Sequence, residues 1–383
     1  MSNRRKPLIV GLDVVRFTAA AMVMCFHLCT SSWADKSSIT QSIVGGGAAF
    51  PELFSATWCG WLGVEIFFVI SGLVIAYSAE SATAFQFLLS RVLRLYPAAW
   101  ICATITAITI LAVGNETTRH VKREWLHSVT LSPAQPYIDP VYWTLGVEIS
   151  FYTVIFLLLS TKRFRYLERV VLILGCVSSG YWILGTEFAP EFLQQQLWNR
   201  TLELSLVAYG CFFGVGALTY LIAREGRSLL RMFAMGVFIA AGLIEVSYKV
   251  VDMNFVFHTA ESAVLPQCLF LLAIGCIFAS MRRIAIRPGN TARLIRLVGL
   301  ATYPLYLFHQ VVGAAIMKAV LAQGGSRYAA LISAIVLCLA GSLIIAKVIE
   351  PPVRATLRVL LMGISGLPLW DRIRRLRVVT TAT

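Results

Sequence analysis

The sequence predicts an all-α polytopic membrane protein with about ten transmembrane helices. Hydrophobic residues make up 58% of the 383 residues and charged residues only 14%, which is far more apolar than a soluble domain. Apolar stretches of 17 to 24 residues recur along the whole chain, and each can cross the roughly 30 Å hydrocarbon layer of a bilayer. Lysine and arginine gather in the gaps between these stretches, as they do at membrane surfaces.

The apolar stretches place the predicted helices in order along the chain. The ten spans are Leu8–Cys29, Gly60–Ala79, Leu93–Val113, Val141–Thr161, Arg169–Gly185, Leu202–Ala223, Met232–Tyr248, Ala263–Met281, Val298–Leu321 and Tyr328–Ile349. The sequence contains no internal repeat and no appended soluble domain. We therefore expect one transmembrane domain over residues 1–355, followed by a basic cytoplasmic tail over residues 356–383.

The basic residues also predict an orientation. An even number of spans puts both termini on the same side of the membrane. If that side is the cytoplasm, the cytoplasmic segments hold 23 lysines and arginines and the outer loops hold only 7, as the positive-inside rule requires. This topology accounts for the net charge of +14 without a polyanion, so we expect no nucleic-acid partner.

The nine cysteines do not indicate a metal or redox site. They form no CxxC pair, and no cysteine and histidine spacing suits zinc, so we expect no bound metal. Cys29 and Cys59 lie at the outer ends of the first two spans, where an oxidising compartment permits a disulfide. Two free thiols are the alternative.

The first span carries two ionisable residues, Arg16 and His27. An ionisable side chain at membrane depth costs about 2 to 3 kcal/mol or more, so it needs a partner, a watery cavity or a function. Eleven residues at about 100° each return to nearly the same helix face, about 16 Å further along the axis. We expect both side chains to face one cavity at different depths. The alternative is a snorkelling arginine and an interfacial histidine.

Two glutamates are predicted at the same depth as His27. Glu65 lies five residues inside the outer end of the second span, and Glu148 lies seven residues inside the fourth. A neutral imidazole can take a hydroxyl proton while a carboxylate fixes its tautomer, so this level suits proton transfer. Glu148 is the preferred partner of His27. A structural hydrogen bond between helices is the alternative role for either glutamate.

Two further features carry candidate chemistry. His309 is predicted in the middle of the ninth span, where it is either a functional group or one end of a helix-to-helix hydrogen bond. Arg91 and Arg94 lie three residues apart at the predicted start of the third span, and so on one helix face. Two such guanidinium groups can clamp a phosphate, although the positive-inside rule alone would also place arginines there.

Five short motifs occur in order along the chain. They are Gly11-Leu12-Asp13 followed by Arg16 and then by His27 after ten residues, Gly63-Val64-Glu65-Ile66-Phe67-Phe68-Val69-Ile70-Ser71-Gly72, Arg91-Val92-Leu93-Arg94-Leu95-Tyr96-Pro97, Tyr142-Trp143-Thr144-Leu145-Gly146-Val147-Glu148-Ile149-Ser150-Phe151-Tyr152, and Tyr306-Leu307-Phe308-His309 with Glu350-Pro351. Together they resemble the motifs of the acyltransferase-3 family of membrane-bound acyltransferases. Thr144 stands where that family has serine, which keeps the hydroxyl.

The resemblance implies a function, a compartment and several roles. It implies an O-acyltransferase in a bacterial inner membrane, with an acyl-CoA donor, most commonly acetyl-CoA, entering from the cytoplasm. The acceptor would be a saccharide hydroxyl on the outer side or in the membrane, for example in an exopolysaccharide. The resemblance also implies an essential histidine at the position of His27, and handling of the donor by Arg91 and Arg94.

These implications combine with the residues into one hypothesis. Arg91 and Arg94 hold the CoA phosphates, and the pantetheine arm extends past Arg16 toward His27, which acts as general base. Ser71 or Tyr152 would stabilise the oxyanion. The remaining site predictions are His309 and Glu148 as catalytic groups, and Glu65 and Trp143 as groups that contact substrate. A covalent acyl group on His27 is an equally acceptable route.

Acceptor recognition is expected in the outer loops, which supply aromatic and amide groups suited to sugars, although these groups also serve as interfacial anchors. These residues are Trp125, Tyr137, Glu187, Glu191, Gln194, Gln195, Gln196 and Trp198. The competing hypothesis is a proton-coupled transporter, in which His27, Glu65, Glu148 and His309 form a proton relay. A transporter needs no CoA site, so acyl-CoA binding separates the two.

Overall fold

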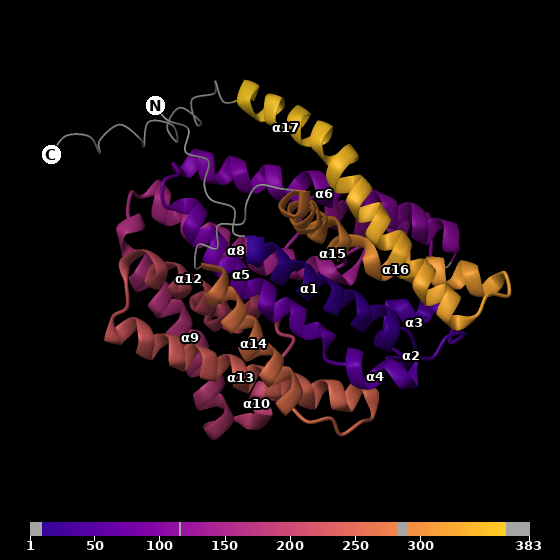
Figure 1. The fold of residues 1–383 in the computed structure, drawn as a ribbon, viewed down its shortest axis with the longest axis horizontal. Helices are drawn as coiled ribbons and strands as arrows, with labels where there is room; N and C mark the ends of the chain where they lie inside the picture. The colour runs from indigo at the N-terminus through magenta and orange to yellow at the C-terminus, as the bar shows by residue number, and fades with distance from the viewer. Residues whose placement is uncertain (1–9, 115, 282–289, 365–383) are drawn as a thin grey trace.

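The computed structural model describes residues 10–114, 116–281 and 290–364, and these ranges form helices and turns without a strand (Figure 1). The longer helices are α1 (Val10–Cys25), α5 (Gly63–Ala79), α6 (Ala84–Val113), α7 (Thr118–Val129), α8 (Trp143–Ser160), α9 (Leu167–Phe188), α12 (Gly210–Glu225), α13 (Leu229–Phe257), α14 (Val264–Met281), α15 (Asn290–Ala322), α16 (Arg327–Ile344) and α17 (Glu350–Ile364). The short elements are η1 (Phe26–Ser31) and η5 (Ile345–Ile349), both π-helical, the 3₁₀ turns η2 (Gly60–Leu62), η3 (Pro140–Tyr142) and η4 (Phe164–Tyr166), and the helices α2 (Ser32–Ala34), α3 (Ile39–Val44), α4 (Pro51–Thr57), α10 (Pro190–Gln196) and α11 (Arg200–Leu204).

The fold confirms an all-α membrane protein. Within the described ranges, nine helical segments are long and apolar enough to cross a bilayer. The sixth predicted span, Leu202–Ala223, is not among them, because the chain turns after α11 and α12 has only 16 residues. Most residues of α12 are buried, so neighbouring helices rather than lipid surround it.

Ion pairs at one end of the bundle show that α12 nevertheless runs across it. Arg231, in the first turn of α13, binds Glu168 in the first turn of α9 at 2.8 Å and Glu225 at the end of α12 at 2.5 Å. Arg224 of α12 binds Glu80, which follows the end of α5, at 2.8 Å. The helix α12 therefore returns to the end of the bundle from which α9 started.

Two glycines of α5 allow its neighbours to approach closely. A Cβ on Gly63 would lie 2.3 Å from the carbonyl oxygen of Ala19 in α1. A Cβ on Gly72 would lie 2.2 Å from the carbonyl oxygen of Phe213 in α12. Small residues at such crossings let membrane helices pack backbone to backbone. The two glycines of the second motif thus hold α5 between α1 and α12.

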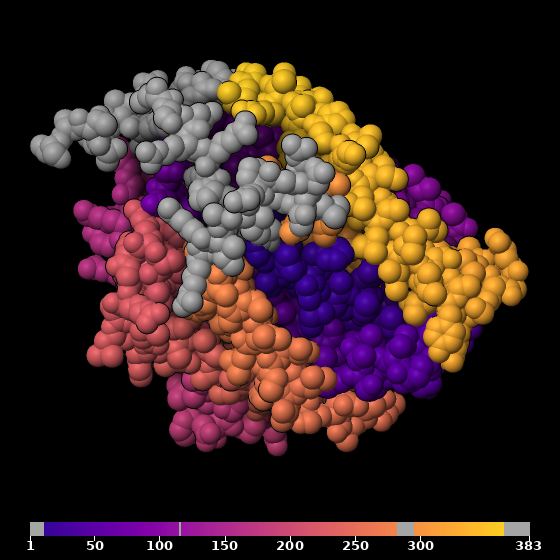
Figure 2. All heavy atoms as spheres, in the orientation of Figure 1, coloured from indigo at the N-terminus to yellow at the C-terminus, as the bar shows by residue number. Residues whose placement is uncertain are grey.

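We call the end of the bundle where α5 and α12 end the basic end, because Arg91, Arg224, Arg231 and Arg354 lie there. The amphipathic helix α17 packs against α6 and crosses one edge of the molecule (Figure 1). The space-filling view shows atoms of the first helices, in indigo, exposed between α14 and the yellow C-terminal helices (Figure 2). The sequence predicts that the basic end is cytoplasmic.

The third predicted span begins earlier than expected. The helix α6 begins at Ala84, nine residues before the predicted Leu93. Thr83 caps it, because its side chain accepts a hydrogen bond from the Gln86 amide while the Gln86 side chain accepts one from the Thr83 amide. The arginines of the third motif therefore lie in the second and third turns of a helix and not at its start.

The seventh predicted span ends later than expected. Its helix, α13, continues to Phe257, nine residues past the predicted Tyr248, because apolar residues resume after Lys249. Lys249, the first residue after the predicted end of the seventh span, therefore lies inside a helix. Cys29 and Cys59 are free thiols. Residues 356–364 of the predicted tail belong to α17, whereas residues 365–383 and the first two residues of the first predicted span lie outside the described residues.

Candidate active site

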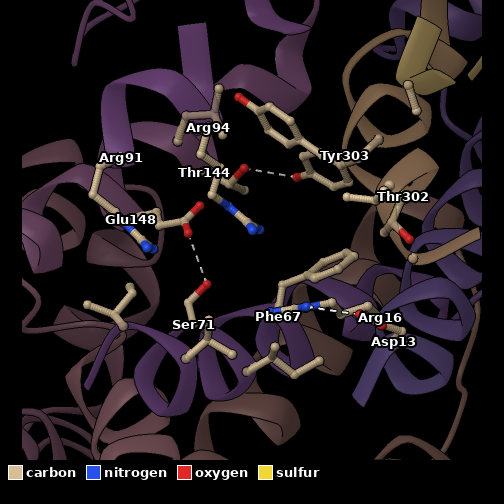
Figure 3. A pocket seen from close by; sticks show the side chains of 18 of the residues that line it. Asp13, Arg16, Phe67, Ser71, Arg91, Arg94, Thr144, Glu148, Thr302 and Tyr303 are labelled. Carbon is tan, nitrogen blue, oxygen red and sulfur yellow. Dashed lines mark hydrogen bonds and ion pairs between the residues drawn. The ribbon is translucent and has the colours of Figure 1, made fainter. Parts of the chain in front are cut away.

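A cavity of about 500 Å³, the larger of two among the described residues, is lined by residues from the half of the bundle nearer the basic end. Figure 3 shows it from close by. Polar side chains from six helices line it. They are Asp13 and Arg16 of α1, Ser71 of α5, Arg91 and Arg94 of α6, Thr144, Glu148 and Tyr152 of α8, Arg296, Thr302, Tyr303 and Tyr306 of α15, and Glu350 and Arg354 of α17. Five arginines face three carboxylates, so the cavity is suited to a polyanion.

Arg91 and Arg94 point into this cavity (Figure 3). The Arg91 guanidinium lies 5.3 Å from the ring centre of Phe87 and 5.4 Å from that of Tyr152, and one of its terminal nitrogens is buried without a hydrogen-bond partner. The Arg94 side chain is exposed to the cavity, and no ion pair fixes it within the described ranges. By contrast Arg16 binds Asp13 at 3.2 Å. The pair on α6 is therefore free to bind phosphate oxygens.

Glu148 lies in the larger cavity and not beside His27. Its carboxylate accepts hydrogen bonds from the Tyr152 hydroxyl at 2.5 Å and from the Ser71 hydroxyl at 3.2 Å. Because α5 and α8 run parallel, Glu148 lies level with Ser71, about 9 Å further along α5 than Glu65. The predicted common level of the three groups is wrong, because depth counted from predicted span ends misses this offset between helices.

A smaller cavity, about 130 Å³, lies on the other side of the same core. It is lined by Val23, Phe26, His27, Trp61, Val64, Glu65, Pro140, Val141, Trp143, Trp198, Lys249, Met253, Tyr306 and Gln310. Of the predicted site residues, His27, Glu65 and Trp143 therefore lie together. His27 belongs to the π-helical segment η1, a type of distortion often found at functional sites.

His309 is the ionisable group that lies next to His27. The two ring centres are 5.3 Å apart. His309 Nδ1 lies 3.0 Å from the carbonyl oxygens of Leu305 and Tyr306. Because carbonyls only accept hydrogen bonds, Nδ1 carries the proton and Nε2 is left as an acceptor. Both His309 Nε2 and His27 Nδ1 are buried without a partner among the described residues, so each can serve the other.

Two residues, Val64 and Tyr306, line both cavities and so form the wall between them. The Tyr306 hydroxyl lies 3.1 Å from the Thr144 hydroxyl and 3.4 Å from the carbonyl oxygen of Val141. The Tyr306 ring centre is 6.2 Å from that of His309. A row of polar aromatic groups thus connects the smaller cavity with the larger one.

The sequence analysis missed the charged groups of α13. Lys249 is 7% exposed, and its Nζ lies 3.9 Å from a carboxylate oxygen of the fully buried Glu65. Glu245, one turn earlier, is 2% exposed and has an unpartnered oxygen. The signal was present, because an ionisable pair four residues apart within an apolar helix is a functional candidate in a membrane protein.

The whole fold and this site can be compared with known proteins. The family model described as an acyltransferase domain matches residues 9–347. The chain belongs to this acyltransferase family. It is 24% identical over 330 residues to nodulation protein 10 of Rhizobium leguminosarum bv. viciae, covering 79% of this chain and 82% of the relative. It is 28% identical over 300 residues to the exopolysaccharide production protein ExoZ of Rhizobium meliloti (strain 1021), covering 74% of this chain and 86% of the relative.

No solved structure matches the chain significantly. The family match and the apolar helices together establish a multi-pass membrane acyltransferase. They also confirm the resemblance drawn from the five motifs. Most residues that line the larger cavity belong to those motifs, as do His27, Val64, Glu65, Trp143 and Tyr306 of the smaller one, so the motifs lie within the bundle.

Proposed function

We propose that the protein transfers an acyl group, normally acetyl, from acyl-CoA on the cytoplasmic side of a bacterial inner membrane to a saccharide hydroxyl. The observation that carries this proposal is the pair of cavities separated by Val64 and Tyr306, one rich in arginine and the other containing His27. A polyanionic donor suits the larger cavity, and an uncharged hydroxyl suits the smaller one. The printed name of ExoZ, which concerns exopolysaccharide production, supports a cell-surface glycan as acceptor.

The donor would bind through its phosphates. Arg91 and Arg94 are neighbours on one face of α6 and form no ion pair within 4.0 Å among the described residues, so their guanidinium groups can bind phosphate oxygens. Arg296 lines the same cavity and adds positive charge, whereas Arg354 is paired with Glu350. The thioester end of the donor extends past Ser71 toward Tyr306, which brings the acyl carbon to the wall between the cavities.

The transfer step uses the histidine pair. The acceptor oxygen attacks the thioester carbon while His27 Nε2 takes the hydroxyl proton. The C–S bond of the resulting tetrahedral intermediate then breaks, and the CoA sulfur leaves as a thiolate that takes up that proton. His27 Nδ1 and His309 Nε2 have no hydrogen-bond partner among the described residues, and their ring centres are 5.3 Å apart. A rotation of the His27 ring would let its Nδ1–H donate to His309 Nε2, which keeps the other nitrogen of His27 unprotonated and ready to act as base.

The oxyanion is assigned to the wall between the cavities. Ser71 and Tyr152 were the predicted stabilising groups, but both donate their hydroxyl protons to Glu148. The hydroxyls of Tyr306 and Thr144 lie at the wall, and the bond from Tyr306 to the Val141 carbonyl is long at 3.4 Å. A weakly held hydroxyl proton can turn to an oxyanion at small cost.

The test measures release of free CoA from acetyl-CoA by the purified protein with a panel of saccharides. We expect acceptor-dependent release that His27→Ala abolishes. Arg94→Ala should weaken binding of acetyl-CoA. Arg358→Ala removes an exposed arginine of α17 outside the cavity and is the control for that variant. Unchanged release by His27→Ala would refute the role of this histidine. Absence of acetyl-CoA binding under all conditions would favour proton-coupled transport instead.

A further inference from the structure

The smaller cavity contains polar atoms that the transfer step does not use. Trp61 Nε1, both carboxylate oxygens of Glu65 and the side-chain oxygen of Gln310 have no hydrogen-bond partner among the described residues. These three side chains are only 5%, 0% and 4% exposed, respectively. Buried polar groups left unpaired destabilise a protein, so this set is built for a ligand that forms several hydrogen bonds at once.

Aromatic rings surround the same space. Trp61, Trp143 and Trp198 line the cavity, and the Lys249 ammonium lies 5.9, 5.9 and 4.4 Å from their ring centres, respectively. Trp198 is 54% exposed and therefore lies where a ligand would enter. Tryptophan faces combined with buried hydrogen-bonding groups recognise a ligand that is apolar on its faces and polar around its edge, as a sugar ring is.

The charges around Lys249 are unbalanced. Glu245 and Asp252 lie on the same face of α13 as Lys249, at four and three residues from it, and Glu65 approaches it from α5. Three acidic side chains thus lie near one ammonium group, and Glu65 is the one of them that lines the cavity. A negatively charged group on a ligand would therefore meet more acidic than basic side chains at this depth, where the surroundings screen charges poorly.

We propose that the smaller cavity binds one sugar ring of the acceptor and that this ring carries no anionic group. This inference rests on the proposed function, because it assigns the acceptor subsite of the same enzyme. The ring stacks against tryptophan, its hydroxyls donate to Glu65 and Gln310 and accept from Trp61 Nε1, and one hydroxyl reaches His27. Lys249 donates to the remaining ring oxygens.

The preference for an uncharged sugar ring is tested with pairs of methyl glycosides that differ only at C6. Methyl glucoside, galactoside and mannoside are each compared with the corresponding methyl uronide, and binding is followed by tryptophan fluorescence of the purified protein without acyl-CoA. We expect at least one neutral glycoside to bind, and its uronide to bind at least about tenfold more weakly. Equal or tighter binding of the uronide, or no binding by any pair, would overturn the proposal.

Single substitutions show whether the glycoside binds in the smaller cavity. Trp198→Leu should weaken binding of the neutral glycoside about tenfold, whereas Trp198→Phe, which keeps an aromatic face, should retain most of it. Trp100→Leu removes a tryptophan of α6 outside the cavity and should leave the dissociation constant unchanged. Glu245→Gln should narrow the preference for the neutral sugar over its uronide, since it removes one of the three carboxylates. An unchanged preference would show that these charges do not select the acceptor.

The two proposals fail separately. Sugar binding measured without acyl-CoA reports only on the acceptor subsite. Release of CoA reports on acyl transfer. Protein that transfers acyl groups normally, but whose acceptor KM is the same in Trp198→Leu, would refute the subsite and leave the function standing. Protein that binds neutral glycosides yet never releases CoA would refute the proposed function and leave the sugar subsite standing.

Discussion

Replacing His309 tests whether this residue positions His27. His309 is fully buried, its Nδ1–H is committed to two backbone carbonyls, and its Nε2 has no hydrogen-bond partner among the described residues. Its ring centre lies 5.3 Å from that of His27. In His309→Ala, the Nδ1–H of His27 has no acceptor, and the imidazole can adopt the other tautomer, which cannot take the hydroxyl proton with Nε2. The variant should therefore lower kcat.

The size of the effect follows from the hydrogen bond proposed between the two histidines. Leaving one buried donor unsatisfied costs about 1 to 3 kcal/mol. At about 1.4 kcal/mol for each factor of ten in rate, kcat should fall by about 5-fold to 150-fold. The KM for acetyl-CoA should stay within about twofold, because no donor-binding arginine contacts His309.

The assay is CoA release under saturating acetyl-CoA and acceptor, with thermal unfolding in detergent as a check on folding. His309→Gln is the matched variant, because its amide oxygen can accept the bond from His27 and should restore part of kcat. An alanine variant that folds and keeps the wild-type kcat would refute the pairing. So would a glutamine variant no better than alanine, or a loss confined to KM.

Three further predictions concern donor binding and packing. Arg94→Ala should raise the KM for acetyl-CoA about 10-fold to 100-fold, because a charge-assisted hydrogen bond to phosphate contributes about 1.5 to 3 kcal/mol; steady-state kinetics measures this. Gly63→Ala should lower the thermal unfolding temperature and the activity together, because its Cβ would overlap the Ala19 carbonyl and push α1 away. Arg231→Ala should lower the unfolding free energy by about 1 to 2 kcal/mol in urea, since both of its carboxylate partners lose their ion pair.

Each of these predictions has a control. Arg358→Ala should leave the KM for acetyl-CoA within about twofold, and a rise equal to that of Arg94→Ala would mean that net charge and not the cavity holds the donor. Gly236→Ala, at a position of α13 with open space around it, should be tolerated where Gly63→Ala is not. Arg227→Ala, an exposed arginine before α13, should not change stability, and an equal loss there would contradict the role of Arg231.

Much of the fold follows from the sequence because membrane insertion is a local property. The length and apolarity of each segment fix whether it can cross lipid, and this is why the all-α bundle was predicted. The sixth predicted span also crosses the bundle, as the helix α12. With 16 residues, α12 is shorter than the helices that are long enough to span a bilayer. The ends of α6 and α13 were misjudged, because arginine and lysine inside a helix resemble the boundary residues of a span.

The candidate site was predicted in part. Periodicity within one helix fixes which residues share a face, so the grouping of Arg91 with Arg94 needed no structure. The expected pairing of His27 with Glu148 failed, because it compared depths between two helices. Relative depth depends on how the helices pack, and here the close crossings at Gly63 and Gly72 set the level of α5.

By itself the sequence predicted nine of the membrane-spanning segments in their order, the polar residues held at membrane depth, and the family. Only the tertiary structure decided that these residues divide between two cavities, that His309 is the neighbour of His27, and that Lys249 with Glu65 belongs to the smaller cavity. The physical reason is that hydropathy and periodicity describe each helix alone. The partner of a buried charge is set by contacts between helices far apart in the chain.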